Sequence, residues 1–267
     1  MTEILKSQLQ GRVLRMVLNR PEKRNALNAA LCRELVDAIS RANRDPQIGV
    51  ILLAGAGSAF SAGMDLGEIQ DVSAIRPEQV SSVHEQLFTI GMRLSKPVIG
   101  EIQGPALGGG VGLVANCHIV VSSPDATFGL TEIRLGLWPF LVFRAVSVAL
   151  GERRAVELAL TGRIFHAQEA KELGLVHEIA QDVPARSMEL AVQIAESSPT
   201  AVRSGLNFVA EARGRDWETA GLIARRVRDE LFHSGDFQEG VRAFREKRKP
   251  KWPSMSFTDD YPGEKVL

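Results

Sequence analysis

Short strand-like runs alternate with longer amphipathic runs over the first two thirds of the chain. Residues 4–21 read as two short strands joined by a turn at Gly11. The run GVILLAG, residues 49–55, is continuously apolar, which is typical of a strand buried on both faces of a parallel sheet. Two further short strands are predicted at 97–104 and 117–123.

Helical patterns lie between these strands and after them. Residues 28–45 carry apolar side chains at three- and four-residue spacing, with Asn28 as a suitable N-cap and Pro46 as a stop. A second helix with the same spacing is predicted over 80–94. From residue 140 onward the pattern is mostly helical, apart from a brief strand at 174–179. This order predicts an α/β fold of parallel βαβ units followed by a helical C-terminal region.

Composition adds limits on class and compartment. The 267 residues are 45% hydrophobic and 24% charged, ordinary values for a globular protein. Lys+Arg and Asp+Glu number 32 each, so no overall charge favours a nucleic-acid or membrane partner. Cys32 and Cys117 lie apart in apolar runs, as expected of thiols in a reducing compartment. With no apolar leader near the N-terminus, we expect a cytoplasmic protein. No His, Cys, Asp or Glu pair has the spacing of a metal site.

A glycine-rich segment, GPALGGGVGLVANC at 104–117, has five glycines in its first nine residues. Gly110 to Ala115 fit the G-x-G-x-x-A fingerprint of dinucleotide enzymes, although about six residues separate the predicted strand from the first glycine. The run AFSAG is similar to the nucleophile elbow of serine hydrolases, but Ala59 replaces its first glycine. A third interpretation is an oxyanion hole, made where 60–66 and 104–113 follow neighbouring strands and bring backbone amides to a carbonyl oxygen.

The third interpretation gains support from a family resemblance over about residues 10–250. FSAGMDL matches the crotonase superfamily's F-x-A-G-x-D-[LI], and KPVIGEIQGPALGGG matches its glycine-rich block. FGLTEIRLGL, ALTGRIFHAQEAKELGLV and EGVRAFREKRKP match further blocks in order. The chain thus resembles the enoyl-CoA hydratases and isomerases. That resemblance implies a crotonase-like ββα spiral core, placed at 1–195, and a helical trimerisation region at 196–267.

The resemblance also implies a catalytic set. The oxyanion amides would belong to Met64 and Gly109, and the acid/base carboxylate would be Glu132 in the FG-x-x-E block. Hydratases of the family carry another glutamate twenty residues earlier, where this chain has Gly112. We expect the missing side chain to leave space there for a branched acyl group, a bound anion or an ordered water.

One carboxylate suffices to isomerise an enoyl thioester, because it can remove a proton from C2 and return one to C4. The segment LGLWPFLVFRAV also departs from the hydratases' LG-x-x-P-G-x-G-G-T, and its PF is similar to mitochondrial enoyl-CoA isomerases. We therefore favour isomerisation. An atypical hydratase using water without the first glutamate, a non-catalytic acyl-CoA binder and a nucleotide-dependent oxidoreductase stay open as alternatives.

Substrate contacts are likewise implied by resemblance. Coenzyme A enters as part of the substrate, with no separate cofactor, and the assembly is expected to be a homotrimer or homohexamer. On the loop side, Arg24 would meet the phosphates, with Lys23 a weaker candidate, Ala26 would line the pantetheine channel, and the backbones of Ala62, Asp65 and Leu66 would lie near the adenine. Lys247 and Lys249 would be further phosphate contacts, from the same subunit or a neighbouring one. Trp138 and Phe140 would line the acyl pocket, or else belong to the core.

Overall fold

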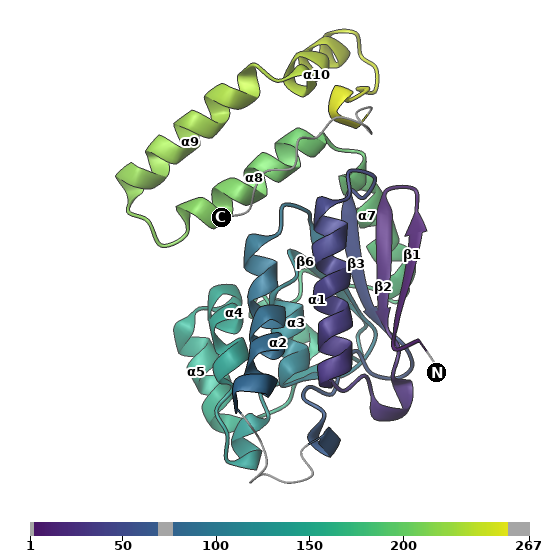
Figure 1. Ribbon diagram of the computed structural model, residues 1–267, viewed down its shortest axis with the longest axis vertical. Coiled ribbons are helices and arrows are strands. Elements are labelled where there is room, and N and C mark those ends of the chain that lie inside the picture. The colour runs from purple at the N-terminus through teal and green to yellow at the C-terminus, as the bar shows by residue number, and fades with distance from the viewer. Residues whose placement is uncertain (1–2, 69–76, 256–267) are drawn as a thin grey trace.

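The computed structural model describes residues 3–68 and 77–255, which form a twisted main sheet with helices on both faces (Figure 1). The main sheet has the order β1 (Leu5–Gln10), β2 (Val13–Leu18), β3 (Val50–Gly55), β4 (Val98–Ile102), β6 (Ile119–Ser122), β9 (Glu178–Ile179). β1 is antiparallel to β2, and all later neighbours are parallel. The carboxyl ends of β2, β3, β4 and β6 therefore meet at one edge, where open α/β sheets bind ligands.

Two hydrophobic cores lie on the two faces of the main sheet. One core packs the sheet against α1 (Ala29–Arg44), α2 (Pro77–Ile90) and α3 (Gly109–Ala115). The other packs it against α7 (Val183–Ala195). Side chains of β3 alternate between the two cores, which explains why this strand is apolar at every position.

A small second sheet lies beyond the carboxyl ends of the main strands. It consists of β5 (Ala106–Leu107), β7 (Thr127–Gly129) and β8 (Phe165–His166), with β5 parallel and β8 antiparallel to β7. The remaining helices of the first 172 residues are α4 (Phe140–Leu150), α5 (Glu152–Thr161), α6 (Ala167–Glu172), and the 3₁₀ helices η1 (Pro21–Lys23), η2 (Leu66–Glu68), η4 (Gly91–Arg93) and η5 (Glu132–Leu135). A last 3₁₀ helix, η6 (Pro253–Met255), packs against the C-terminal helices.

The C-terminal helices form a separate layer at the opposite, amino edge of the main sheet (Figure 1). They are α8 (Pro199–Ala212), α9 (Trp217–Phe232) and α10 (Gly235–Arg245), and neither α8 nor α9 contains a buried residue. A polar contact attaches the layer to the end of α7, where Trp252 Nε1 donates to the Glu196 carbonyl at 2.7 Å. Within the layer, Ser198 Oγ at the start of α8 donates to Asp236 of α10 at 2.5 Å.

The predicted elements of the main sheet are confirmed. Asn28 caps α1 by accepting a 2.9 Å hydrogen bond from the Leu31 amide, and the helix ends at Arg44, two residues before Pro46. The second sheet was not predicted, because strands of two or three residues are too short to show an alternating pattern. Among the described residues both cysteines are free thiols, and no helix combines the length and hydropathy of a membrane span. The chain passes from α7 to α8 at residues 196–198, while the independence of 1–195 and 196–267 stays a prediction.

Candidate active site

Three loop segments lie side by side beyond the ends of β2, β3 and β4. The Ala62 amide donates to the Arg24 carbonyl at 2.9 Å, and the Leu27 amide donates to the Gly63 carbonyl at 2.7 Å. On the other side, the Leu107 amide donates to the Ser61 carbonyl at 2.9 Å. The two segments expected to supply oxyanion amides are therefore held against each other by their backbones.

Hydrogen bonding leaves the two expected oxyanion amides free. Leu27 bonds to the neighbours of Met64 on both sides, Gly63 and Asp65, so the Met64 amide points away from Leu27. Gly109 is the first residue of α3, and the first amides of a helix have no partner within it. In the part of the chain that the structure describes, neither amide has a hydrogen-bond acceptor.

Gly63 and Gly108 permit the close approach of these backbones. Gly63 has a φ of +87°, and a Cβ there would lie 2.6 Å from the Leu107 oxygen and 3.1 Å from the Gly109 nitrogen. Gly108 has a φ of +51°, and a Cβ there would lie 3.0 Å from Oε1 of Glu132. Glycine is needed at both positions for conformation and for space.

Glu132 reaches the loop because β5 and β7 pair in parallel. Leu107 is opposite Gly129, and the Gly108 amide donates to the Gly129 carbonyl at 2.8 Å. Glu132 opens η5, three residues after Gly129, so its carboxylate lies against Gly108. The structure thus brings Glu132, Gly109 and Met64 to one place, as the resemblance implies.

The Glu132 side chain is half-buried, and its carboxylate is incompletely bonded. Its Oε2 is shielded from solvent and has no hydrogen-bond partner among the described residues. Burial raises the pKa of Glu132, opposed by a hydrogen bond from its own backbone amide. A carboxyl group with a raised pKa and an unoccupied oxygen is suited to exchanging a proton with a bound molecule.

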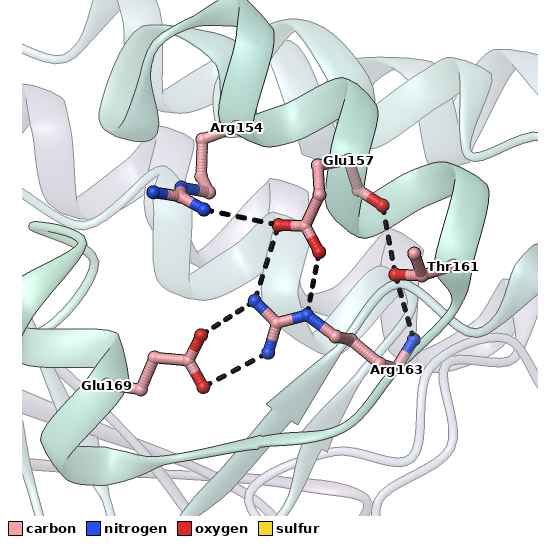
Figure 2. A network of polar contacts seen from close by, with 5 residues as sticks. All are labelled: Arg154, Glu157, Thr161, Arg163 and Glu169. Atoms are coloured by element: carbon pink, nitrogen blue, oxygen red, sulfur yellow. Dashed lines mark hydrogen bonds and ion pairs between the residues drawn. The ribbon is translucent and has the colours of Figure 1, made fainter.

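A network of charged side chains surrounds Arg163 (Figure 2). It lies beside the segment that carries Glu132, because a Cβ at Gly162 would lie 2.6 Å from Ile133 Cγ2. Arg163 donates to Glu157 at 2.7 Å through Nε and to Glu169 at 2.6 Å through Nη2, which joins α5 to α6. The hydrogen bonds from Arg163 lower the pKa of both glutamates. The residue after Arg163, Ile164, packs on Gly129, because a Cβ at Gly129 would lie 2.7 Å from Ile164 Cδ1.

Gly112 does not open a space beside Glu132, so that expectation is wrong. A Cβ built on Gly112 would overlap Cγ1 of Val142, would lie 2.8 Å from its Cβ and 3.0 Å from Cδ1 of Phe88. Val142 and Phe88 are 3% and 5% exposed. The glycine lets α4 and α2 pack closely on α3, and hydrophobic side chains fill the volume that a side chain at 112 would occupy.

The two aromatic residues expected in the acyl pocket are placed differently from each other. Phe140 is 76% exposed, so its ring lines no enclosed pocket made by the described residues, contrary to expectation. Trp138 is half-buried, with its ring 5.6 Å from that of Phe143, and packs against the main core. Apolar side chains nearby, including Leu137 at 46% exposure, leave a hydrophobic surface around the mouth of the site.

Residues expected to contact coenzyme A on the loop side surround the same edge of the sheet. Arg24 is exposed, Ala26 is buried and Leu66 is 49% exposed. The half-buried Ala62 binds the Arg24 carbonyl through its amide, as described above. The side chain of Asp65 forms an ion pair with Arg20 at 2.8 Å. Burial raises the pKa of Asp65, but hydrogen bonds from Arg20 and a backbone amide outweigh it and lower the pKa overall.

Lys247 lies at the wrong edge of the sheet to join this site within one chain. It follows α10, in the layer beyond the amino ends of the strands (Figure 1). Nearby Lys249 is 3.8 Å from Glu196, and the adjoining end of α7 packs on Gly49 just before β3. A role for Lys247 or Lys249 in binding substrate would therefore need a neighbouring subunit.

Asn25 and Ser61 are structural parts of the site that the sequence analysis missed. Asn25 is fully buried with a φ of +54°, and its side chain donates to the carbonyls of Ala56 and Ala59 at 2.8 Å. Ser61 donates to the Asn25 carbonyl at 2.9 Å and accepts from the Gly63 amide at 3.3 Å. The available signal was an asparagine between η1 and α1, since asparagine tolerates the left-handed conformation.

No group of three His, Cys, Asp or Glu in the described ranges is placed to hold a metal ion. The glycines of the apparent dinucleotide fingerprint pack internally: a Cβ at Gly110 would lie 2.5 Å from the Ser61 oxygen. The groups available for chemistry are therefore a half-buried carboxylate, with one shielded and unbonded oxygen, and free backbone amides in the loops beside it.

Comparison with known proteins places this geometry in a family. The enoyl-CoA hydratase/isomerase family model matches residues 8–255. A putative enoyl-CoA hydratase of Thermus thermophilus is 35% identical over 250 residues, covering 91% of this chain and 98% of the relative. A mevalonyl-coenzyme A hydratase of Aspergillus fumigatus is 36% identical over 253 residues, covering 90% and 91%.

Solved structures agree with the sequence comparisons. The crystal structure of an enoyl-CoA hydratase from Mycobacterium smegmatis superposes with a TM-score of 0.89 at 30% identity, covering 94% of this chain and 99% of that one. The fold agrees with these matches. The chain belongs to the enoyl-CoA hydratase/isomerase family, within the crotonase superfamily.

Proposed function

We propose that this protein moves the double bond of an enoyl-CoA thioester, with Glu132 as the only carboxylate that carries the proton. The substrate is a 3-enoyl thioester and the product its 2-enoyl isomer. Glu132 removes a proton from C2, electrons move into the thioester oxygen, and the resulting dienolate takes the proton back at C4. The proton and the double bond are thus conserved, and no water is consumed.

The thioester oxygen would lie between the Met64 and Gly109 amides. Negative charge develops on that oxygen in the dienolate, and donors already fixed in place stabilise it without reorganising. Both amides are free, as described above, and glycines bring their backbones together. Removal of one such donor typically costs about 10²–10³ in rate.

The observation that carries the preference for isomerisation is the filled space at Gly112. Hydration needs a positioned water as well as a proton donor, and the family's hydratases use two glutamates for this. Here Val142 and Phe88 occupy the place of the second side chain. No acidic side chain is present at 112 to position a water, and apolar side chains lie against its backbone, which favours proton transfer between two carbons of the substrate.

The test is a spectrophotometric comparison of 3-enoyl and 2-enoyl thioesters of several chain lengths. The proposal expects conversion of 3-enoyl to 2-enoyl thioesters and little hydration of the latter. Efficient hydration of 2-enoyl thioesters by the natural enzyme would contradict it. Binding of both without turnover would instead identify a non-catalytic acyl-CoA binder.

A hydratase with one glutamate is the second candidate, since both relatives described above carry hydratase names. In that case a water held against Glu132 alone would supply both hydrogen and hydroxyl. Exchange in ²H₂O separates the two: an isomerase acting through one carboxylate retains part of the C2 proton at C4, whereas a hydratase takes its new C2 proton from solvent.

Binding of coenzyme A and assembly belong to the same proposal. Arg24 would meet the phosphates, while backbone groups at Ala62 and Leu66 would contact the adenine. Because α8 and α9 bury no residue and expose side chains such as Leu222, at 58%, we propose that they pack against other subunits in a trimer or a pair of trimers. A monomer in sedimentation at micromolar concentration would contradict the assembly.

A further inference from the structure

A second cavity lies at the amino edge of the main sheet, away from Glu132. It has a volume of about 250 Å³ and is lined by His118, His177 and Arg213 together with small, mostly apolar residues. His118 directly precedes β6, and His177 directly precedes β9, the neighbouring strand. The proposed function uses none of these three side chains.

The two histidines are fixed in the same way by the strand beside each of them. The Val98 amide donates to Nδ1 of His118 at 3.0 Å, and the His118 amide donates back to the Val98 carbonyl at 2.8 Å. Val120 and His177 repeat this arrangement at 3.1 and 3.0 Å. An Nδ1 that accepts a hydrogen bond carries no proton, so the N–H of each ring is at Nε2.

Each Nε2–H is a donor without an acceptor in the protein, as far as the described residues extend. Arg213 follows α8, has no ion pair among these residues and brings its positive charge near His118. Burial, together with that charge, lowers the pKa of His118 and keeps its ring neutral. None of the described residues lining the cavity is acidic.

The rest of the lining is small and largely apolar. Ala145, Val148 and Ala149 come from the last turns of α4, and Val148 is 52% exposed. The polar side chain of Asn116 is turned to the backbone, since its Nδ2 donates to the Gly112 carbonyl at 2.8 Å and the Phe88 carbonyl at 3.2 Å. The cavity thus has hydrogen-bond donors and a cation from His118, His177 and Arg213, and an aliphatic surface from α4.

We propose that this cavity binds a short-chain aliphatic carboxylate. The carboxylate accepts hydrogen bonds from Nε2–H of His118 and His177 and pairs with the Arg213 guanidinium, while the chain packs on Ala145 and Val148. A carboxylate only accepts hydrogen bonds, which matches a set made only of donors. This site is distinct from the acyl-CoA site and does not depend on the activity proposed there.

The test is thermal stabilisation of the full-length natural protein by sodium hexanoate at pH 7.5 and constant ionic strength. A ligand that binds the folded state alone raises the melting temperature in a saturable way. We expect hexanoate to do so, with affinity falling about fourfold for each methylene removed toward acetate. Inorganic phosphate, which has charge without an aliphatic chain, is the comparison ligand.

Four variants test the placement of the ligand. Arg213→Gln should weaken the binding of hexanoate at least tenfold. Arg215→Gln changes an exposed arginine two residues away and should leave the binding unchanged. His118→Asn and His177→Asn keep an acceptor near the Nδ1 position for the backbone amide but remove the Nε2 donor. Both should fold and should lose affinity.

Several results would overturn the site. Hexanoate that does not raise the melting temperature would exclude the site. Hexanoate that binds Arg213→Gln as tightly as the natural protein would place the ligand elsewhere. Inorganic phosphate that binds as tightly as hexanoate would show that the aliphatic chain makes no contact. Equal effects of Arg213→Gln and Arg215→Gln would reduce the interaction to general surface charge.

Discussion

Glu132 lies against Gly108, directly before α3, whereas Gly112 lies inside α3, and the surroundings of the two residues are built in opposite ways. At Glu132, a titratable side chain is half-buried, with one carboxylate oxygen shielded from solvent and lacking a partner among the described residues. At Gly112, the side chain is absent and two hydrophobic neighbours fill the volume. The first arrangement leaves a carboxylate oxygen free to exchange a proton, at a cost in stability, while the second is packed with apolar groups that cannot. The difference teaches that a glycine in place of a larger side chain need not create a pocket.

The largest effect is expected from removing the charge at Glu132. Glu132→Gln has nearly the same shape but cannot accept a proton, so turnover should fall at least 10²–10⁴-fold. Binding of a CoA thioester should stay within a few-fold, which isothermal titration would measure. Turnover retained in this variant would remove Glu132 from the mechanism.

The oxyanion amides should give the next largest effect. Gly109→Pro removes the N–H at the first position of α3, where proline is tolerated, and should cost about 10²–10³ in kcat. Gly109→Ala is the matched control, because its Cβ makes the same 3.1 Å approach to Leu27 and Phe88 but keeps the amide. If both variants lose activity equally, packing rather than the missing donor is responsible.

The packing at Gly112 can be opened by mutation to test whether a second carboxylate there would add hydration. Gly112→Glu alone should destabilise the protein by roughly 1–3 kcal/mol or more, through overlap with Val142 and burial of a charge. Adding Val142→Gly removes the overlapping atoms, so the double variant should recover stability and gain hydration of 2-enoyl thioesters. Val142→Gly alone is the control, and it should gain no hydration. A well-folded double variant that hydrates no better than this control would show that the second acid is not what the site lacks.

The cost of burying Glu132 should be visible in the pH dependence of stability. Its pKa is raised in the folded state, so the folded protein binds more protons there and loses stability as pH rises through that raised value. Glu132→Gln should therefore melt at a higher temperature than the natural protein at pH 8, with the difference shrinking toward pH 4. In the natural enzyme, activity should rise with pH over a limb above the ordinary carboxyl range. A melting difference independent of pH would contradict the assignment.

The smallest effect is expected from removing the ion pairs of Arg163 (Figure 2). Arg163→Met keeps length and apolar contact but removes the bonds to Glu157 and Glu169, both about one-third exposed. Partly exposed ion pairs contribute about 0.2–1 kcal/mol each, so the melting temperature should fall by a few degrees and turnover by a few-fold. Arg154→Met, which loses a single 3.5 Å pair to Glu157, is the milder control.

Much of the fold was predictable because it depends on local patterns. A few consecutive residues were enough to predict β3 from its continuous apolar run, and α1 from its apolar spacing and its Asn28 cap. The expectation of Glu132, Met64 and Gly109 as site residues came from the resemblance of the motifs to a known family, while the glycine-rich loops by themselves indicated only that backbones approach closely. These features need only neighbours in the chain or a recurring motif to be recognised.

What the sequence determined was which residues could do the chemistry: one carboxylate at Glu132, none at Gly112, and glycines around two amides. Tertiary structure decided what surrounds them. That Val142, thirty positions away, fills the space at Gly112, and that Lys247 lies at the far edge of the sheet, depends on how α4 and α10 pack. Packing contacts join residues distant in sequence, and no periodicity or spacing along the chain records them.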